Sequence, residues 1–279
     1  MKTDEFTPSR LESWVYWRNR NTQDIYSQPF NLLSEALGVD GMPTRADFLE
    51  LDEECPICSD TLVVNHPNKG ILYCLCYMLE WQNELVRRYE NIRGSVQPAT
   101  LATIQYPQVW KGRRELASLK RAVDDTGNFI GNPQANWLIL DGLYGTGKTH
   151  MLRAVNTALW PVAVYIVAKD IEDMTHVYRK NDDMGELYNA LRWAPVLLLD
   201  DIGAEYGGRL VQTMIERVVD SRYENWNEYP MMVTTNKREN EFIEGDYIMR
   251  AYSRWHDPAI AKWNSILTPS YRELSLRHR

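Results

Sequence analysis

The sequence lacks any apolar run that approaches the length of a membrane-spanning helix. Its first ten residues are polar, so we do not expect a secretory signal peptide. It also lacks an excess of positive charge, because the formal net charge is −7. That balance argues against a protein that coats nucleic acid by bulk charge, although it leaves room for a local basic track. We therefore expect a cytoplasmic protein with no membrane contact.

Basic residues are nevertheless concentrated in one part of the chain. Residues 84–122 carry eight lysines and arginines against three acids, whereas residues 1–54 carry eleven acids against five bases. The 279 residues, 44% of them hydrophobic, are enough for a full α/β core and a smaller appendage. The basic stretch indicates a connector between these two parts.

Cysteine is scarce, and all four cysteines fall in one short segment: Cys55, Cys58, Cys74 and Cys76. In a reducing compartment, a C-x-x-C pair followed by a second close pair favours a tetrahedral zinc site over disulfides. A redox pair and thiols without metal remain as alternatives, and His66 is a substitute ligand for the less usual C-x-C half. Such a closed site would hold together a module too small for its own core.

The most specific pattern is GLYGTGKT at 142–149, which fits the phosphate-binding loop G-x-x-x-x-G-K-[ST]. An apolar run at 136–141 precedes it and a helix-like segment at 149–160 follows it, which is the context that this motif requires. Its glycines allow backbone N–H groups to point at a triphosphate, its lysine can reach the β- and γ-phosphates, and its threonine can hold Mg²⁺. The residues expected to bind ATP and Mg²⁺ are Gly142, Gly145, Thr146, Gly147, Lys148, Thr149 and, downstream, Asp200.

Further apolar runs at 162–168, 195–200, 230–235 and 264–268 alternate with helical patterns at 171–192 and 208–224. This alternation predicts an α/β fold with a parallel five-stranded sheet flanked by helices. The run PVLLLDDIG at 195–203 predicts a Walker B strand that ends beside the phosphate loop. We expect Asp200 to hold Mg²⁺ and Asp201 to polarise the attacking water, with Glu205 as a weaker candidate.

Three more residues are candidates for catalysis. Asn236 ends the run VTTN, where a polar side chain beside Walker B can orient the attacking water. Arg250 and Arg254 are four residues apart, so they share one helix face and either could reach the γ-phosphate of a neighbouring subunit as an arginine finger. The alternative interpretation is that these two are surface arginines that form ion pairs with Asp246 or Asp257.

Together these motifs resemble the AAA+ ATPases of the DnaC/DnaI helicase-loader group and their IstB-type transposition relatives. The stretches that match are 142–150, 198–203, 234–236, 250–254 and 270–272. The resemblance implies an AAA+ ATPase with little or no C-terminal lid, since only 43 residues follow Asn236. With the residue patterns above, it suggests three parts: a helical zinc-knuckle module at 1–92 that binds a partner, a basic connector and start of the ATPase domain at 93–122, and the AAA+ ATPase domain at 123–279.

The resemblance also implies partners. The N-terminal module would bind the replicative DNA helicase, and the ATPase domain would form a homo-oligomer in the ATP state that binds single-stranded DNA. Candidate DNA contacts are Lys169, Tyr178, Arg179 and Lys180, where an aromatic ring beside cations suits base stacking and phosphate contact. For each of these, a solvated helix face is the competing interpretation.

Three other functions are compatible with the motifs. A transposition-helper ATPase would bind duplex DNA and a transposase, and the cysteine-bearing module favours the loader over it. A P-loop kinase for a small molecule would require a lid and would not need an arginine acting in trans. A binding scaffold in which ATP acts as a structural switch also stays possible. The side chain of Asp201 is shorter than that of glutamate, so we expect hydrolysis to be slow.

Overall fold

The computed structural model describes residues 63–66, 70–73, 85–106, 113–159, 163–180, 184–203, 209–237 and 249–271, except single positions at 87, 91, 195 and 228. The chain divides into two compact units, Met1–Glu84 and Leu85–Arg279. In the first unit, the described residues form an antiparallel hairpin of β1 (Val63–His66) and β2 (Gly70–Tyr73).

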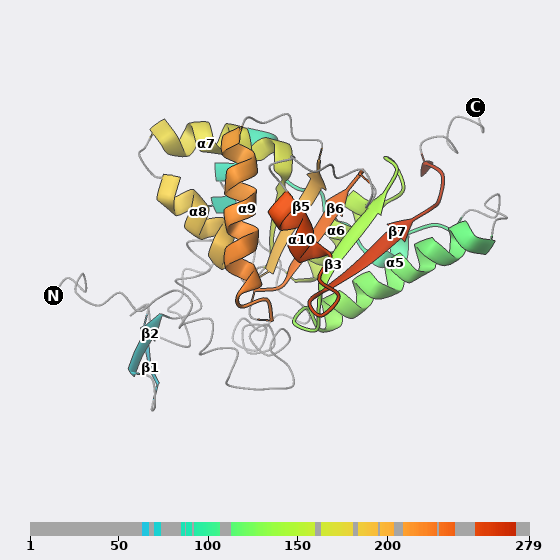
Figure 1. Cartoon of the computed structure of the whole chain (residues 1–279), viewed down its shortest axis with the longest axis horizontal. Helices are drawn as coiled ribbons and strands as arrows, with labels where there is room; N and C mark the ends of the chain where they lie inside the picture. The colour runs from blue at the N-terminus through green and yellow to red at the C-terminus, as the bar shows by residue number, and fades with distance from the viewer. Residues whose placement is uncertain are drawn as a thin grey trace, which may run out of the picture. The chain divides into compact units, whose positions relative to one another are not determined.

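The second unit is built on a five-stranded sheet in which every pair is parallel (Figure 1). The strand order is β4-β5-β6-β3-β7. Every residue of β3, β4 and β6 is buried, as expected for strands covered on both faces. The predicted α/β class and five-stranded parallel sheet are therefore confirmed. The strands are β3 (Trp137–Gly142), β4 (Ala163–Val167), β5 (Val196–Ile202), β6 (Met231–Thr235) and β7 (Ala261–Ile266).

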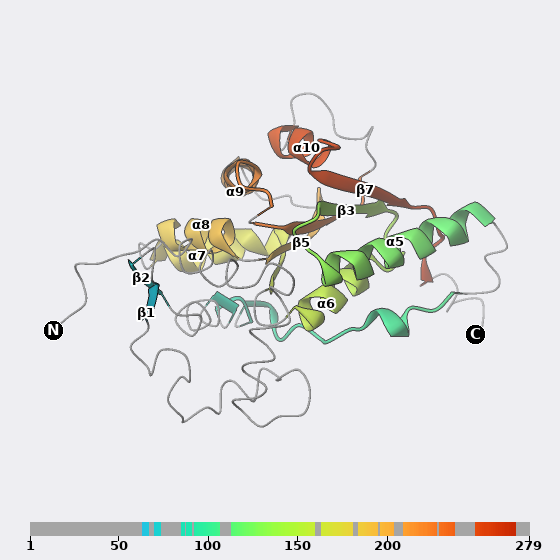
Figure 2. The ribbon, with the colours of Figure 1, turned by 90° about the horizontal axis from the view of Figure 1, so that it is seen from below.

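Helices cover both faces of this sheet (Figure 2). On one face lie α5 (Arg113–Gly131) and α6 (Lys148–Ala158), and on the other lie α9 (Arg209–Tyr223) and α10 (Met249–Trp255). After β4, a short 3₁₀ turn η2 (Ala168–Asp170) leads into α7 (Ile171–Lys180) and α8 (Met184–Trp193), which pack against α9. None of the helices in the described ranges is long and apolar enough to cross a membrane.

The last strand begins earlier than its apolar run predicts, at Ala261 instead of 264. The reason is that Lys262 interrupts the apolar pattern near the start of the strand. Lys262 and Asn264 both donate hydrogen bonds to the buried Asp125 of α5, at 2.6 and 2.7 Å. Both polar side chains form hydrogen bonds with a residue that is distant in the sequence. The sequence pattern alone therefore does not reveal this edge strand. The helical pattern at 171–192 likewise corresponds to two helices, α7 and α8.

The second unit begins at Leu85, upstream of the expected boundary at 93. The described residues between 85 and 93, here called the linker helix, are helical. Its Tyr89 is 2% exposed, and its hydroxyl donates a hydrogen bond to Asp170 and accepts one from the backbone N–H of Val167. A 3₁₀ turn η1 (Leu101–Thr103) then follows. The residues that a C-terminal lid would require, after 271, lie outside the described part.

Candidate nucleotide-binding site

The loop after β3 has the backbone geometry of a phosphate cradle. Gly142, Gly145 and Gly147 have φ angles of 146°, 76° and 97°, which L-residues with a side chain rarely adopt. A Cβ on Gly145 would lie 2.1 Å from the hydroxyl oxygen of Ser270, so the approach of the chain after β7 also requires glycine there. Thr146 closes the loop by donating to the carbonyl of Leu143 at 2.9 Å. The N-terminus of α6, which starts directly after the loop, favours an anion.

Lys148 is buried at the start of α6 and its Nζ is enclosed by acceptors. It donates to the carbonyls of Gly142 and Leu143 at 2.7 and 2.9 Å, and to Oδ1 of Asn236 at 2.9 Å. Burial lowers the pKa of Lys148 to about 8, although the nearby carboxylates, led by Asp201, oppose that change. The ammonium is thus held in the loop by groups that phosphate oxygens could replace.

Asp200 lies at the end of the buried part of β5, where it is 3% exposed. Its Oδ1 accepts hydrogen bonds from Thr149 at 3.1 Å and from Thr234 at 2.5 Å, and its Oδ2 accepts one from Tyr165 at 2.6 Å. A threonine hydroxyl and a carboxylate oxygen that meet beside a phosphate loop are the donor set that Mg²⁺ takes in P-loop proteins. The residues present therefore fit a magnesium ion.

Asp201 has a backbone conformation that is unusual for a residue with a side chain, with φ of 62°. The ladder between β5 and β6 shifts register between Leu199 and Ile202, and Asp201 lies in this irregular stretch. Its N–H donates to Thr234 Oγ1 at 2.9 Å, and its side chain accepts a hydrogen bond from the Asn236 amide. Burial, and then repulsion from Asp200, raise the pKa of Asp201 above its ordinary value.

The strand order explains why these residues meet. Because β6 lies between β3 and β5, its carboxyl end lies between the phosphate loop and the Walker B aspartates. Asn236, at that end, accepts from Lys148 and donates to Asp201 with one amide. It bridges the two motifs that the sequence predicted separately, in addition to the direct hydrogen bond from Thr149 to Asp200.

Thr234 and Tyr165 contact the site but were not among the residues predicted from the sequence. Thr234 was noted only as part of the VTTN pattern, and Tyr165 falls in an apolar strand run. Both bond to Asp200 from strands that flank β5. Tyr271 was likewise recognised only within a matching stretch. Its N–H donates to the carbonyl of Gly145 at 2.9 Å and its hydroxyl to that of Gln105 at 2.5 Å.

The two candidate arginines lie on α10, away from the described contacts of the phosphate loop. Arg250 is exposed. Arg254 contacts its own subunit: its Nε donates to Asp220 at 3.3 Å, and its guanidinium lies 4.3 Å from the centre of the Tyr223 ring. An exposed ion pair of this kind contributes about 0–1 kcal/mol, so it is no barrier to a second partner. The structure thus leaves both arginines as candidates.

No family model matches the chain. The chain is 26% identical to the replicative helicase loader DnaC of Escherichia coli (strain K12) over 140 residues, which are 48% of this chain and 56% of that protein. The chain resembles the DnaC-type loaders. The similarity agrees with the resemblance that the motifs predicted. DnaC of Shigella flexneri matches with the same identity and coverage, so the chain spans about half of the length of the curated relatives that it matches.

Two solved structures are also similar to the chain. A crystal structure of the DnaC helicase loader is 23% identical with a TM-score of 0.47, and the match covers 64% of this chain and 99% of that one. A crystal structure of DnaI is 20% identical with a TM-score of 0.44, and the match covers 62% of this chain and 89% of that one.

The residues expected to contact DNA are not all available for that role. Lys169 is exposed on η2. Tyr178, in contrast, is 3% exposed, and the guanidinium of Arg88 lies 4.8 Å from the centre of its ring. The ring is therefore part of the packing between α7 and the linker helix and cannot stack on a base in this conformation. The side chains of Arg179 and Lys180 lie outside the described residues.

The four cysteines, Cys55, Cys58, Cys74 and Cys76, lie outside the described residues, so zinc binding stays a prediction. The hairpin between the two pairs is described, and its register pairs Val63 with Tyr73 and His66 with Gly70. The role of His66 as a substitute ligand likewise stays a prediction. Glu205 and Arg272 also lie outside the described residues.

Proposed function

We propose that this protein is an ATP-dependent loader of a replicative DNA helicase, with an AAA+ ATPase domain in its second unit. The observation that carries the proposal is the joined site, in which Asn236 connects Lys148 of the phosphate loop to Asp201 of Walker B. The similarity to DnaC supports the loader over the other P-loop functions. The transposition helper, which binds duplex DNA and a transposase, becomes an outcome of the test below.

The first step is nucleotide binding. The loop at 142–147 and the first N–H groups of α6 receive the phosphates, and Lys148 exchanges its carbonyl partners for phosphate oxygens. Thr149 and Asp200 would hold Mg²⁺, which neutralises charge on the β- and γ-phosphates when it is bound. The buried position of Asp200 removes competing water from this carboxylate.

In hydrolysis, a water oxygen attacks the γ-phosphorus, and the bond from that phosphorus to the bridging oxygen of the departing ADP breaks. Asp201 orients this water and accepts its proton. Its raised pKa favours that role, because a carboxylate of ordinary acidity is a weaker base. Asn236 holds the Asp201 side chain by its amide. The short reach of aspartate leads us to expect slow turnover that assembly or DNA stimulates.

The remaining proposed roles, for the arginines, the DNA contact and the first unit, require the protein to assemble with its partners. Arg250 or Arg254 of a neighbouring subunit would approach the γ-phosphate, so the active form is a homo-oligomer in the ATP state. Lys169 would contact the backbone of single-stranded DNA. The first unit, Met1–Glu84, stabilised by Zn²⁺ on its four cysteines, would bind the helicase.

The test is light scattering after size exclusion on the full chain mixed with the replicative helicase, with and without ATP and Mg²⁺. Lys148→Ala is the matched control, since it removes nucleotide binding and leaves the first unit intact. We expect a complex that carries several copies of the chain and that depends on ATP in the wild type only. Failure to bind helicase, together with ATP-dependent assembly on duplex DNA, would instead support the transposition helper.

A further inference from the structure

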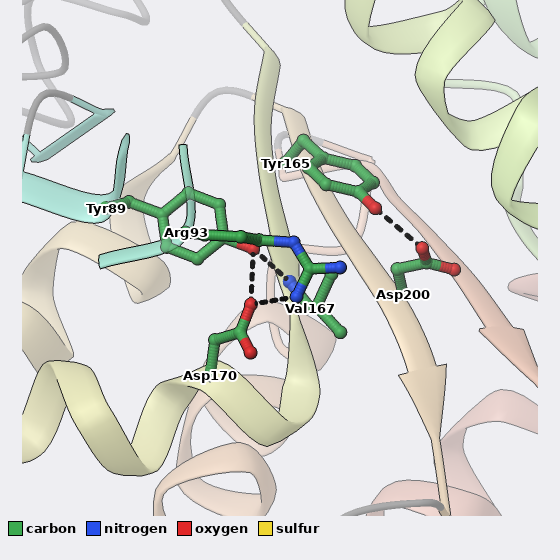
Figure 3. Close-up of polar contacts among 6 residues, drawn as sticks. All are labelled: Tyr89, Arg93, Tyr165, Val167, Asp170 and Asp200. Atoms are coloured by element: carbon green, nitrogen blue, oxygen red, sulfur yellow. Dashed lines mark hydrogen bonds and ion pairs between the residues drawn. The ribbon is translucent and has the colours of Figure 1, made fainter. Parts of the chain in front are cut away.

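Asp200 is held by a tyrosine that belongs to neither nucleotide-binding motif. Tyr165 lies on β4, the strand that pairs with β5, and it is 4% exposed. Its hydroxyl donates to Oδ2 of Asp200 at 2.6 Å (Figure 3). The two residues are not directly opposite each other in the sheet, because Tyr165 pairs with Leu198 and Val167 pairs with Asp200. The phenol thus reaches along the strands toward the carboxyl end of the sheet.

This bond completes the environment of a buried carboxylate. Oδ1 of Asp200 faces the two threonines, Thr149 and Thr234. From the described part of the chain, Oδ2 accepts the hydrogen bond of Tyr165. With donors on both oxygens, the carboxylate cannot rotate about its terminal bond without losing a hydrogen bond. A buried carboxylate that loses a donor also becomes harder to keep charged.

We propose that Tyr165 is a positioning residue for the metal site: it fixes Oδ2 so that Oδ1 faces Thr149, and these two groups would hold the divalent cation. The inference rests on the proposed ATPase function. Outer hydrogen bonds to a metal ligand fix its orientation, and their removal typically costs about 10–100-fold in metal affinity or activity. Tyr165 does not reach the nucleotide in this role, because it acts through Asp200.

The same edge of the sheet supplies a matched control. Tyr89 is 2% exposed, and its hydroxyl donates to the carboxylate of Asp170 at 3.0 Å (Figure 3). That carboxylate also pairs with Arg93, and Tyr89 accepts the N–H of Val167 at 3.0 Å. Tyr89→Phe therefore removes a buried tyrosine hydroxyl from a carboxylate near β4 without touching Asp200. A purely structural role for Tyr165 predicts that the two phenylalanine variants behave alike.

The experiment measures Mn²⁺ binding by the electron paramagnetic resonance of the free ion, with the full chain saturated by a non-hydrolysable ATP analogue. Mn²⁺ occupies oxygen sites of the same kind as Mg²⁺. We expect Tyr165→Phe to raise the Mn²⁺ Kd about tenfold, and Tyr89→Phe to change it less than about twofold. Nucleotide affinity in EDTA should stay within about twofold of the wild type in both variants, because neither residue contacts the phosphate loop.

Equal Mn²⁺ affinity in both variants, whether shifted or not, would refute the positioning role while leaving the proposed ATPase function intact. A wild type that binds the analogue but no Mn²⁺ would overturn the metal site itself, and the positioning role with it. If Tyr165→Phe does not fold, 3-fluorotyrosine at position 165 tests the same bond, because it makes the hydroxyl more acidic and leaves the packing intact. An unchanged Mn²⁺ Kd in that protein would refute the role.

Discussion

We predict that the ionisation of Lys148 makes the affinity for nucleotide strongly dependent on pH. Burial brings its pKa down from 10.5 to about 8 in the free protein. Phosphate oxygens favour the charged form, so binding raises this pKa, and the protonated lysine is the form that binds. Affinity is therefore fully present below the pKa of the free protein and is lost as pH rises through it.

The magnitude follows from the fraction of charged lysine. With a pKa of about 8, that fraction is about 76% at pH 7.5 and about 3% at pH 9.5, so the Kd should rise about 25-fold. An unperturbed lysine would change the Kd by only about 10% over the same range. The assay is titration calorimetry with an ATP analogue in EDTA, in buffers of different ionisation enthalpy. At pH 8, binding should take up about half a proton per site.

The matched variant is Lys148→Arg, because arginine stays charged throughout this range. Its affinity should be nearly independent of pH, even if binding is weaker overall. A wild-type Kd that changes less than about twofold between pH 7.5 and 9.5 would refute the reasoning, as would binding at pH 8 without proton uptake. Either result would mean that the carboxylates near the lysine outweigh its burial.

Three other predictions concern separate parts of the molecule. Asn236→Ala should lower single-turnover ATP hydrolysis about 10–100-fold while changing nucleotide Kd less than about threefold, because one charged hydrogen-bond bridge is lost; an effect confined to Kd would contradict this. Arg222, fully buried, donates to four backbone carbonyls, so Arg222→Met should lower the free energy of unfolding in urea by about 3–5 kcal/mol, and a loss under about 1 kcal/mol would contradict it. Cys55→Ser should release zinc measurable by atomic absorption, and unaltered metal content would remove the zinc assignment.

Some features of the site could be predicted from the sequence because they are local. The phosphate loop needs glycines, a lysine and a threonine at fixed spacing, and all of them lie within 142–149. The Walker B strand was recognisable because four apolar residues precede its aspartates. Arg222 shows the limit of such patterns. A charged residue on a helix is expected on the solvated face, yet its partners are carbonyls at the ends of neighbouring elements.

The backbone of Asp201 was also beyond sequence analysis. A positive φ angle is expected for glycine, and nothing in the pattern LLLDDIG marks an aspartate for it. The conformation accompanies the register shift between β5 and β6 and the hydrogen bond from its N–H to Thr234. These are interactions between strands, and a single strand contains no information about which neighbour it will have.

The sequence by itself determined the phosphate loop, the order of the five parallel strands along the chain, and the two aspartates near the carboxyl end of β5. The tertiary structure alone decided that β6 lies between β3 and β5 and that β4 lies on the other side of β5. That order brings Asn236 between Lys148 and Asp201, and Tyr165 onto Asp200. The physical reason is that hydrogen bonds between strands depend on which strands become neighbours, and this depends on the packing of the whole core.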